Sequence, residues 1–555
     1  MSKMSDLFAR LQAGPTKRVT FVSHSERPWW VGPSLLLIMA LYILPIAGSP
    51  AATNPNEVIR IELAVSIAYW AQLELGPAAE VYGLSEDISI RDGKIYSDKA
   101  PGLSIVSAPL VWIVDPVLSR TPSTDLPDYW ELRHVLTFFL IALPTVALAF
   151  LVGATLPKTS PGRRTAAAVV AALATPLWTY GTVFFGHAPA AFAITLAWFL
   201  LLGLPARKTI LTGRRAALGG MAAGLAVATE YPTVLLVAVI FASLLVRRTA
   251  TPILAAAVAG AFAGALPAMI YHHVAFGAPW VTGYAFKAAA DFQAIHAQGL
   301  VGLSWPSVDS LWGILFGSSR GIIFYSPILL LTPVGLWWFI HRHGWRDAGP
   351  ILIAIAGYVC FAASFVDWPA GWCAAARHLV PIVPLAASMA LFAATRLARR
   401  KWGAVVVVVL TAASGTSTML TIVLTPFFPP EFGAPLAQLV LPSLSDGVAF
   451  ANLLSSASGV ASVWVVAFAG VVVTGALIWA SIRLIGDRRW WPAAVATATN
   501  VVLLSAFAWQ GSAPRAETEL MRAQVLRRLN HFEVADRIEG AIAFRSGQST
   551  GGRSR

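Results

Sequence analysis

The sequence predicts an all-α polytopic membrane protein, and three observations carry this prediction. Of 555 residues, 57% are hydrophobic and only 12% are charged, whereas soluble domains carry roughly 25% charged residues. The mean hydropathy is +0.68. Apolar stretches long enough to cross a bilayer as helices recur along the chain. A soluble enzyme, a disordered chain and a fibrous repeat are excluded, because none of them could cover so much apolar surface.

Thirteen apolar stretches have the length that a transmembrane helix needs. The pairs around Gly186 and Glu230 can each be read as one interrupted segment, so the number is predicted to within one or two. The thirteen are 31–48, 130–155, 166–184, 188–204, 216–230, 232–246, 252–271, 322–340, 349–366, 377–395, 403–425, 459–482 and 492–510.

Basic residues predict how these helices are oriented. If the N-terminal segment 1–30 is cytoplasmic and the chain alternates, every short loop assigned to the inside carries Lys or Arg, as the positive-inside rule requires. The net charge of +13 is then mostly a signal of topology, and no nucleic-acid partner is expected. We therefore predict a multi-pass protein of the plasma (inner) membrane, with its long loops on the extracytoplasmic side.

The same count gives the predicted domain organisation. Residues 31–510 form a transmembrane domain, and residues 511–555 form a polar tail on the outside. Within the tail, 516–532 has helical apolar spacing and mixed charge, which predicts a small cap or a helix on the membrane surface. Three large outside loops are predicted, at 49–129, 272–321 and 426–458.

The first outside loop holds much of the acidic charge, with 12 of the 27 acidic residues between positions 51 and 133. The segment 57–75 has apolar residues at helical spacing and predicts an amphipathic helix on the membrane. Glu57 and Arg60 share a face of its first turn. The helix dipole keeps a carboxylate at this position ionised, so that it could accept a proton from a hydroxyl. The alternative interpretation is a helix cap with a surface ion pair.

A second element of this loop is the turn-rich stretch 93–103, which leads into an apolar helix at 103–118. Here Lys99 stands just before Ala-Pro-Gly. A lysine held at the membrane interface by Pro and Gly suits a phosphate group.

The order of these motifs resembles a known family. One outward span is followed by acid-x-x-Arg at a helix start and, about forty residues on, by Tyr-x-x-Lys-x-Pro. This arrangement is similar to the membrane-embedded GT-C glycosyltransferases, in the bacterial branch of lipid A aminoarabinose transferases and protein O-mannosyltransferase relatives. The acid is Glu where Asp is commoner in the family, and Ala100 and Gly102 flank the proline where the family has a second Pro. The matching residues are Glu57, Arg60, Tyr96, Lys99 and Pro101.

The resemblance implies a GT-C-like bundle and an inverting transfer of a hexosyl or pentosyl group. The donor would be a sugar on a polyprenyl phosphate in the bilayer, and the acceptor an extracytoplasmic hydroxyl of a glycan, lipid or protein. Glu57 would be the catalytic base, and Arg60 and Lys99 would bind the donor phosphate. Some relatives hold a divalent metal cation on the acid before this lysine together with a histidine, which makes Asp98 and His187 the candidate metal ligands.

Polar residues near the other spans are further candidates, because charges there are costly and often functional. Arg320, in a Gly/Ser-rich turn before an apolar helix, and Arg377, at the outer start of a span, are expected at the donor phosphate. For each of these positions an interfacial or helix-end group that reaches water is the alternative. Candidates for contact with substrate or cavity are Tyr96, His187, Glu230, Tyr231, Tyr325 and His378.

Other functions compete with the transferase. A transporter or flippase of lipid-linked sugars would also need cations and aromatic side chains, but it needs no base, so the acidic first loop favours an enzyme. An O-antigen polymerase or ligase is expected to place its large functional loop late in the chain, whereas the acid-rich loop of this chain is the first. The Ala/Gly/Arg-rich composition is typical of a high-GC bacterium such as an actinobacterium, and the resemblance implies a role in building the cell wall or envelope. The carrier would then be decaprenyl phosphate and the sugar a pentose or mannose.

Overall fold

The computed structural model describes residues 31–46, 54–121, 124–157, 159–203, 210–296, 298, 302–450, 452, 460–486, 490–511 and 515–545. The predicted cytoplasmic segment 1–30 lies outside the described residues, as does the end of the tail beyond residue 545.

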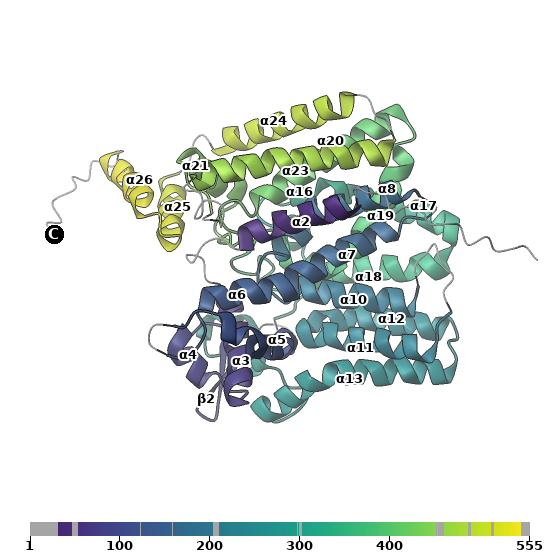
Figure 1. Ribbon diagram of the computed structural model, residues 1–555, viewed down its shortest axis with the longest axis vertical. Helices are drawn as coiled ribbons and strands as arrows, with labels where there is room; N and C mark the ends of the chain where they lie inside the picture. Colours follow the sequence, from purple (N-terminus) through teal and green to yellow (C-terminus); the bar gives the residue numbers. More distant parts are fainter. Residues whose placement is uncertain are drawn as a thin grey trace, which may run out of the picture.

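The protein is a bundle of helices, most of which run roughly side by side (Figure 1). Each of the thirteen predicted spans contains a helix, which confirms an all-α, multi-pass membrane protein. The helices are α2 (Val31–Ile46), α6–η2–α7 (Tyr129–Ala154), α8 (Pro161–Leu173), α10 (His187–Leu201), α11 (Gly213–Thr229), η3–α12 (Tyr231–Val246), α13 (Thr251–Phe276), α17 (Thr332–His343), α18 (Trp345–Ala363), η6–α19 (Arg377–Leu397), α20 (Lys401–Leu420), α23 (Ser462–Ile485) and α24 (Trp491–Gly511).

Among the described residues, seven helices are long and apolar enough to cross a membrane by themselves. They are Tyr129–Ala154, Thr251–Phe276, Trp345–Ala363, Arg377–Leu397, Lys401–Leu420, Ser462–Ile485 and Trp491–Gly511. Two of the others, α8 and α17, cover only part of their predicted spans, because turns interrupt those spans. Short elements complete the bundle, namely η1 (Asp115–Val117), α9 (Leu177–Tyr180), η4 (Gly283–Phe286), α14 (Ala290–His296), α15 (Val308–Leu315), α16 (Ile322–Tyr325) and η5 (Pro327–Leu331).

Small residues bring α11 and α13 into close contact. Gly220 and Gly224 on α11 and Gly260 and Gly264 on α13 are each four residues apart, and a Cβ atom at any of them would overlap a carbonyl oxygen of the facing helix. In a bilayer, helices associate through close van der Waals packing, because lipid is as apolar as the side chains. This pair therefore holds together through backbone contact.

The first outside loop folds into α3 (Pro55–Trp70), α4 (Gly76–Tyr82), the hairpin of β1 (Ile88–Arg91) and β2 (Lys94–Ser97), and α5 (Gly102–Val114). Asp92 and Gly93 both have positive φ angles and form the tight turn typical of an Asp-Gly hairpin. Helix α3 is buried on all sides from Asn56 to Ser66. The prediction of an amphipathic helix on the membrane surface is wrong, since α4, α5 and β2 pack against α3 and these residues are buried.

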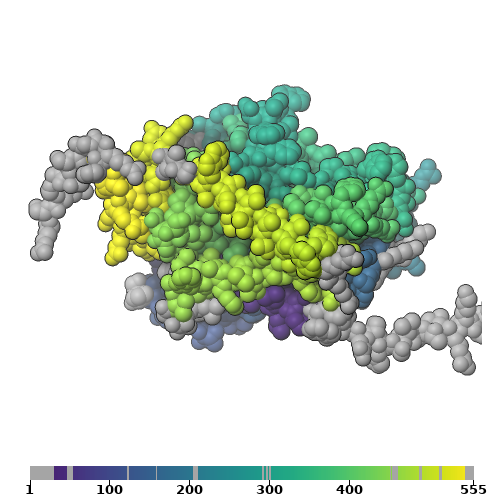
Figure 2. Space-filling model, turned by 90° about the horizontal axis from the view of Figure 1, so that it is seen from above, coloured from purple at the N-terminus to yellow at the C-terminus, as the bar shows by residue number. Residues whose placement is uncertain are grey.

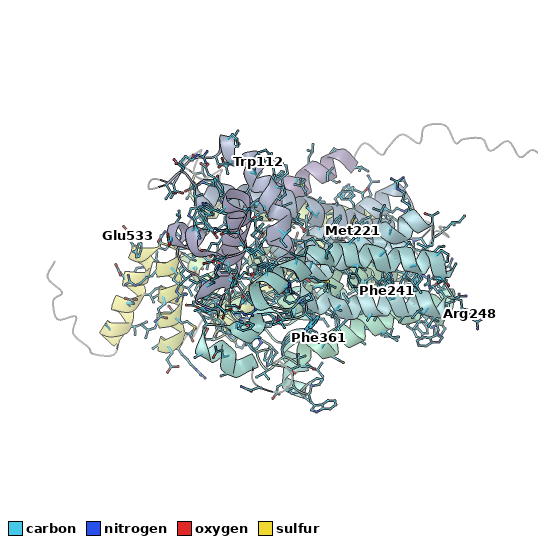
Figure 3. The ribbon with its side chains drawn as sticks, turned by 90° about the horizontal axis from the view of Figure 1, so that it is seen from below. Trp112, Met221, Phe241, Arg248, Phe361 and Glu533 are labelled. Atoms are coloured by element: carbon cyan, nitrogen blue, oxygen red, sulfur yellow. The ribbon has the colours of Figure 1, made fainter. Side chains whose placement is uncertain are left out.

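The C-terminal tail forms a pair of helices, α25 (Ala516–Arg528) and α26 (Phe532–Arg545), which lies at the same end of the molecule as α3 and α4 (Figures 1 and 2). Leu526 is fully buried against the segment of η7 (Leu436–Val440) and α21 (Leu441–Ser445). Glu533, on α26, lies at the opposite end from Arg248, which follows α12 (Figure 3). The predicted placement of Arg248 inside and of the tail outside stays a prediction.

Candidate functional site

A cavity of about 780 Å³ lies at the end of the bundle that carries the first loop. Its volume is typical of a site for a small molecule. Its wall comes from the first loop, α12, α18, the loop before α19 and the C-terminal helix α25. The charged side chains that line it are Glu86, Asp87, Lys99, Glu230, Lys287, Asp367, Arg377 and Arg528.

A row of alternating charges borders one side of this cavity. Lys99 Nζ lies 2.9 Å from Asp87 Oδ1 and 3.1 Å from Asp98 Oδ1, and Lys287 Nζ lies 2.9 Å from Asp98 Oδ2. The hairpin creates this row, because Ile88 pairs with Ser97 and so brings the residue before β1 beside the residue after β2. Lys99 lines the cavity, and its contact with a donor phosphate stays a prediction. Lys287 was missed, because a single lysine in a long loop carries no local signal.

The charges of this row stabilise one another. Burial lowers the pKa of Lys99, but Asp87 and Asp98 raise it further, so that its pKa lies above the usual value. Burial would raise the pKa of Asp87, yet Lys99 holds the pKa of this carboxyl below its usual value. Burial and the neighbouring Lys99 lower the pKa of Lys287. Lys99 therefore stays protonated and Asp87 ionised near neutral pH.

Glu230 follows α11 and lines the cavity, and two side chains contact one of its carboxylate oxygens. Its Oε1 atom accepts a hydrogen bond from Arg60 Nη2 at 3.0 Å and lies 3.4 Å from His187 Nδ1. Among the described residues, no hydrogen bond reaches its Oε2 atom. Arg60 also donates to Asn56 Oδ1 and to the Ala100 carbonyl, each at 3.1 Å. The prediction that Arg60 binds the phosphate directly is corrected, because this side chain is only 2% exposed and contacts Glu230 from behind the cavity wall.

Glu57 is fully buried and does not line the cavity. Arg133 donates to its two carboxylate oxygens, from Nε to Oε2 at 3.1 Å and from Nη2 to Oε1 at 2.9 Å. The backbone N–H of Phe184 donates to Oε1 at 2.7 Å. Glu57 and Arg60 thus have separate partners, although they share a helix turn. The catalytic role of Glu57 stays a prediction, and these contacts favour a structural one.

Arg377, predicted at the donor phosphate, and His378, predicted as a substrate or cavity residue, begin η6 and both line the cavity. The Arg377 guanidinium lies over the Phe185 ring at 6.0 Å, and its Nε atom has no hydrogen-bond partner among the described residues. The His378 ring stacks on Phe365 and lies 5.8 Å from the His187 ring. Arg377 therefore brings to the cavity wall a cation with which no carboxylate of the described residues forms an ion pair.

Three further predicted site residues, Arg320, Tyr325 and Tyr96, do not line the cavity. Arg320 is fully buried, and its guanidinium donates to the carbonyls of Pro369, Gly371 and Phe428 at 2.8, 2.9 and 3.0 Å. The prediction of a phosphate site there is wrong, because backbone carbonyls already occupy the guanidinium. Tyr325 is buried and donates to the carbonyls of the same turn, and Tyr96 packs edge-on against Phe276. Tyr231 does line the cavity, and its hydroxyl lies 2.7 Å from His272 Nε2.

The two candidate metal ligands have different neighbours. Both oxygens of Asp98 contact lysine ammonium groups, and His187 contacts Glu230 and His378. The described part of the chain contains no group of three or more His, Cys, Asp or Glu side chains that could hold a metal ion. The arrangement does not fit a metal at Asp98, since Lys99 and Lys287 supply the positive charge there.

Comparison with known proteins finds no matching family model and no matching curated sequence. The fold is similar to that of several solved structures. ArnT from Cupriavidus metallidurans is 15% identical, with a TM-score of 0.48 over 89% of this chain and 80% of that one. Arabinosyltransferase EmbB from Mycobacterium smegmatis is 12% identical, with a TM-score of 0.41 over 86% of this chain and 40% of that one. The archaeal oligosaccharyltransferase AglB from Archaeoglobus fulgidus is 12% identical, with a TM-score of 0.39 over 71% of this chain and 55% of that one.

Proposed function

We propose that this chain is a membrane glycosyltransferase of the GT-C type, which moves a sugar from a polyprenyl-phosphate donor to an extracytoplasmic hydroxyl. The observation that carries the proposal is the combination within one cavity of Lys99, Lys287 and Arg377 with the clamped carboxylate of Glu230. Transfer from a phosphate carrier needs cations on the leaving phosphate and a base for the acceptor hydroxyl. A transporter needs the cations alone.

The cations are suited to the leaving group. As the bond from the sugar C1 atom to the phosphate oxygen breaks, its electron pair passes to the phosphate, which then carries more negative charge. Arg377 can meet this charge with two parallel N–H groups, and Lys99 and Lys287 as point charges. Because these groups are fixed before the reaction, they stabilise the developing charge without reorganisation.

Glu230 is our candidate for the base. The acceptor oxygen forms the new bond to C1, and its proton moves to Glu230 Oε2, the oxygen without a partner among the described residues. Arg60 and His187 fix the other oxygen and with it the direction of the carboxylate. Attack from the face opposite the phosphate inverts the anomeric carbon. The phosphate and base groups are proposed to lie on the extracytoplasmic side of the plasma membrane.

The test uses the purified full chain in nanodiscs with a panel of radiolabelled polyprenyl-phosphate pentoses and hexoses and an envelope extract as the source of acceptor. We expect transfer by the wild type and by a Glu86→Gln control, since Glu86 is a lining carboxylate for which we propose no role. Glu230→Gln should bind donor and fail to transfer. Parallel samples with EDTA test whether transfer requires a divalent metal cation.

Two results would overturn parts of the proposal. Full transfer by Glu230→Gln removes Glu230 as the base. Binding of the labelled lipid by the wild type with no loss of sugar in any extract favours a transporter of lipid-linked sugars, and vesicle flip assays would then follow.

A further inference from the structure

The C-terminal helices contribute to the wall of the cavity. Val525, Arg528 and Leu529, at the end of α25, line it together with Trp372 from the loop before α19. Helix α25 is outside the membrane-spanning helices and stands at the end of the bundle that carries the first loop (Figure 1). This part of the wall is therefore on the side from which a water-borne or surface-bound acceptor would arrive.

The helix pair is firmly attached to the bundle. Arg522 Nη1 lies 2.7 Å from Asp446 Oδ2, in the segment after α21, and Arg537 Nη2 lies 2.9 Å from the other oxygen of the same carboxylate. Ala523 and Leu526 are fully buried in the cluster that includes Phe428. The end of α25 thus has a fixed position over the cavity.

Neighbouring arginines at this end have different roles. Arg527 pairs with Glu539, Nη2 to Oε2 at 2.7 Å, and with Asp536, and so joins α25 to α26. Arg528 is exposed, and among the described residues no carboxylate pairs with it. Its guanidinium lies 4.6 Å from the centre of the Trp372 ring, in a cation–π contact. Arg528 therefore presents to the cavity a cation that no carboxylate of the described residues neutralises.

Trp372 is held in place by contacts of its own backbone and of its neighbours. Its carbonyl accepts from Asn54 Nδ2 at 3.4 Å, and the N–H of Cys373 donates to the Phe428 carbonyl at 3.1 Å. The preceding Gly371 has a φ of 63°, and the buried Arg320 holds its carbonyl. The ring and Arg528 thus form a preorganised pair at the edge of the cavity.

We propose that Arg528 and Trp372 form an acceptor subsite that selects a hydroxyl compound carrying an anionic group, phosphate or carboxylate, near the hydroxyl. This inference rests on the proposed glycosyl transfer and adds the chemical class of its acceptor. The donor phosphate has its own cations at Lys99, Lys287 and Arg377, so Arg528 is left for a second anion. A guanidinium binds phosphate or carboxylate through paired hydrogen bonds, and an indole ring suits the apolar face of a sugar.

A binding experiment tests the subsite without relying on catalysis. Saturation-transfer NMR on the full chain in nanodiscs would compare mannose 6-phosphate, glucuronic acid and the neutral methyl mannoside. With dodecyl phosphate present to occupy Lys99, Lys287 and Arg377, we expect the two anionic probes to bind more tightly than the neutral one, and Arg528→Ala to remove this difference. The two anions distinguish phosphate from carboxylate recognition. Arg527→Ala is the matched control, since it removes the same charge one residue away and should keep the preference.

A transfer experiment tests the same residue in the reaction. The envelope extract is separated by anion exchange into neutral and anionic fractions before labelled donor is added. We expect label in the anionic fraction, and a rise of about tenfold or more in the acceptor KM for Arg528→Ala, with donor binding unchanged and Arg528→Lys intermediate. Label in the neutral fraction, or equal KM values for Arg528→Ala and wild type, would overturn the subsite. A wild type that binds the anionic probes but transfers no sugar would contradict the proposed function and leave the anion site in place.

Discussion

Replacing Glu57 by glutamine separates a structural role from a catalytic one. In the folded protein, Arg133 is 6% exposed, and Glu57 supplies the carboxylate that both of its hydrogen bonds reach. Glutamine keeps the size but removes the charge, and one of its two terminal atoms becomes a donor facing a donor. Breaking one partner of a buried ion pair costs about 3–5 kcal/mol. We expect Glu57→Gln to lower the free energy of unfolding by an amount in this range.

The double variant Glu57→Gln/Arg133→Gln distinguishes a structural role of Glu57 from a catalytic one. Two neutral amides can bond to each other, so the double variant should recover much of the lost stability. Thermal unfolding in one detergent would be measured for the wild type, both single variants and the double variant, and transfer would be assayed well below the lowest midpoint. If Glu57 is structural, the double variant regains transfer along with stability. Our reasoning is refuted if Glu57→Gln unfolds like the wild type, binds donor and transfers no sugar, because Glu57 would then be the base.

Three further predictions concern the buried Glu62, the lysines of the cavity and the contact between α11 and α13. Burial raises the pKa of Glu62 to about 8. The folded state therefore keeps a proton that the unfolded chain releases above about pH 4.3. The free energy of unfolding should fall by up to about 5 kcal/mol as the pH rises from 4.3 to 8. Glu62→Gln should flatten this pH dependence of the unfolding midpoint, and an unchanged slope would contradict the assignment. Lys99→Ala should weaken binding of dodecyl phosphate at least tenfold, and Lys287→Ala should do so less, as measured by competition with labelled donor. Gly224→Leu should lower the unfolding midpoint by several degrees through its overlap with α13, and a midpoint equal to that of the wild type would show that the helices can separate without cost.

The sequence predicts which segments are helical better than it predicts which side chains pair with one another. Apolar length and loop charge depend on the chain itself, and each predicted span contains a helix. The side-chain pairs depend on which helices meet. Glu57 and Arg60 were expected on one face, but their partners, Arg133 and Glu230, come from other parts of the chain. No spacing along the sequence indicates such contacts, since they follow from tertiary packing.

In the candidate site, too, the sequence predicts local conformation but not the contacts that depend on tertiary packing. Lys99 could be proposed because the Ala-Pro-Gly sequence that follows it restricts its local conformation. Arg320 has an equally suggestive local sequence, yet the fold turns it towards backbone carbonyls. For Lys287 and Arg528, neither the neighbouring residues nor the spacing shows that they reach the cavity formed by the first loop.

The row of Asp87, Lys99, Asp98 and Lys287 bears on turnover. A phosphate that binds Lys99 competes with carboxylates that are already 2.9 to 3.1 Å from the same ammonium group. Under the proposed function, these carboxylates would weaken the binding of the spent carrier phosphate and would pair with the lysines again when it departs. Under the proposed function, removing Asp87 would make the lysines hold the carrier more tightly, so the protein would become slower at steady state while its first reaction cycle kept its speed.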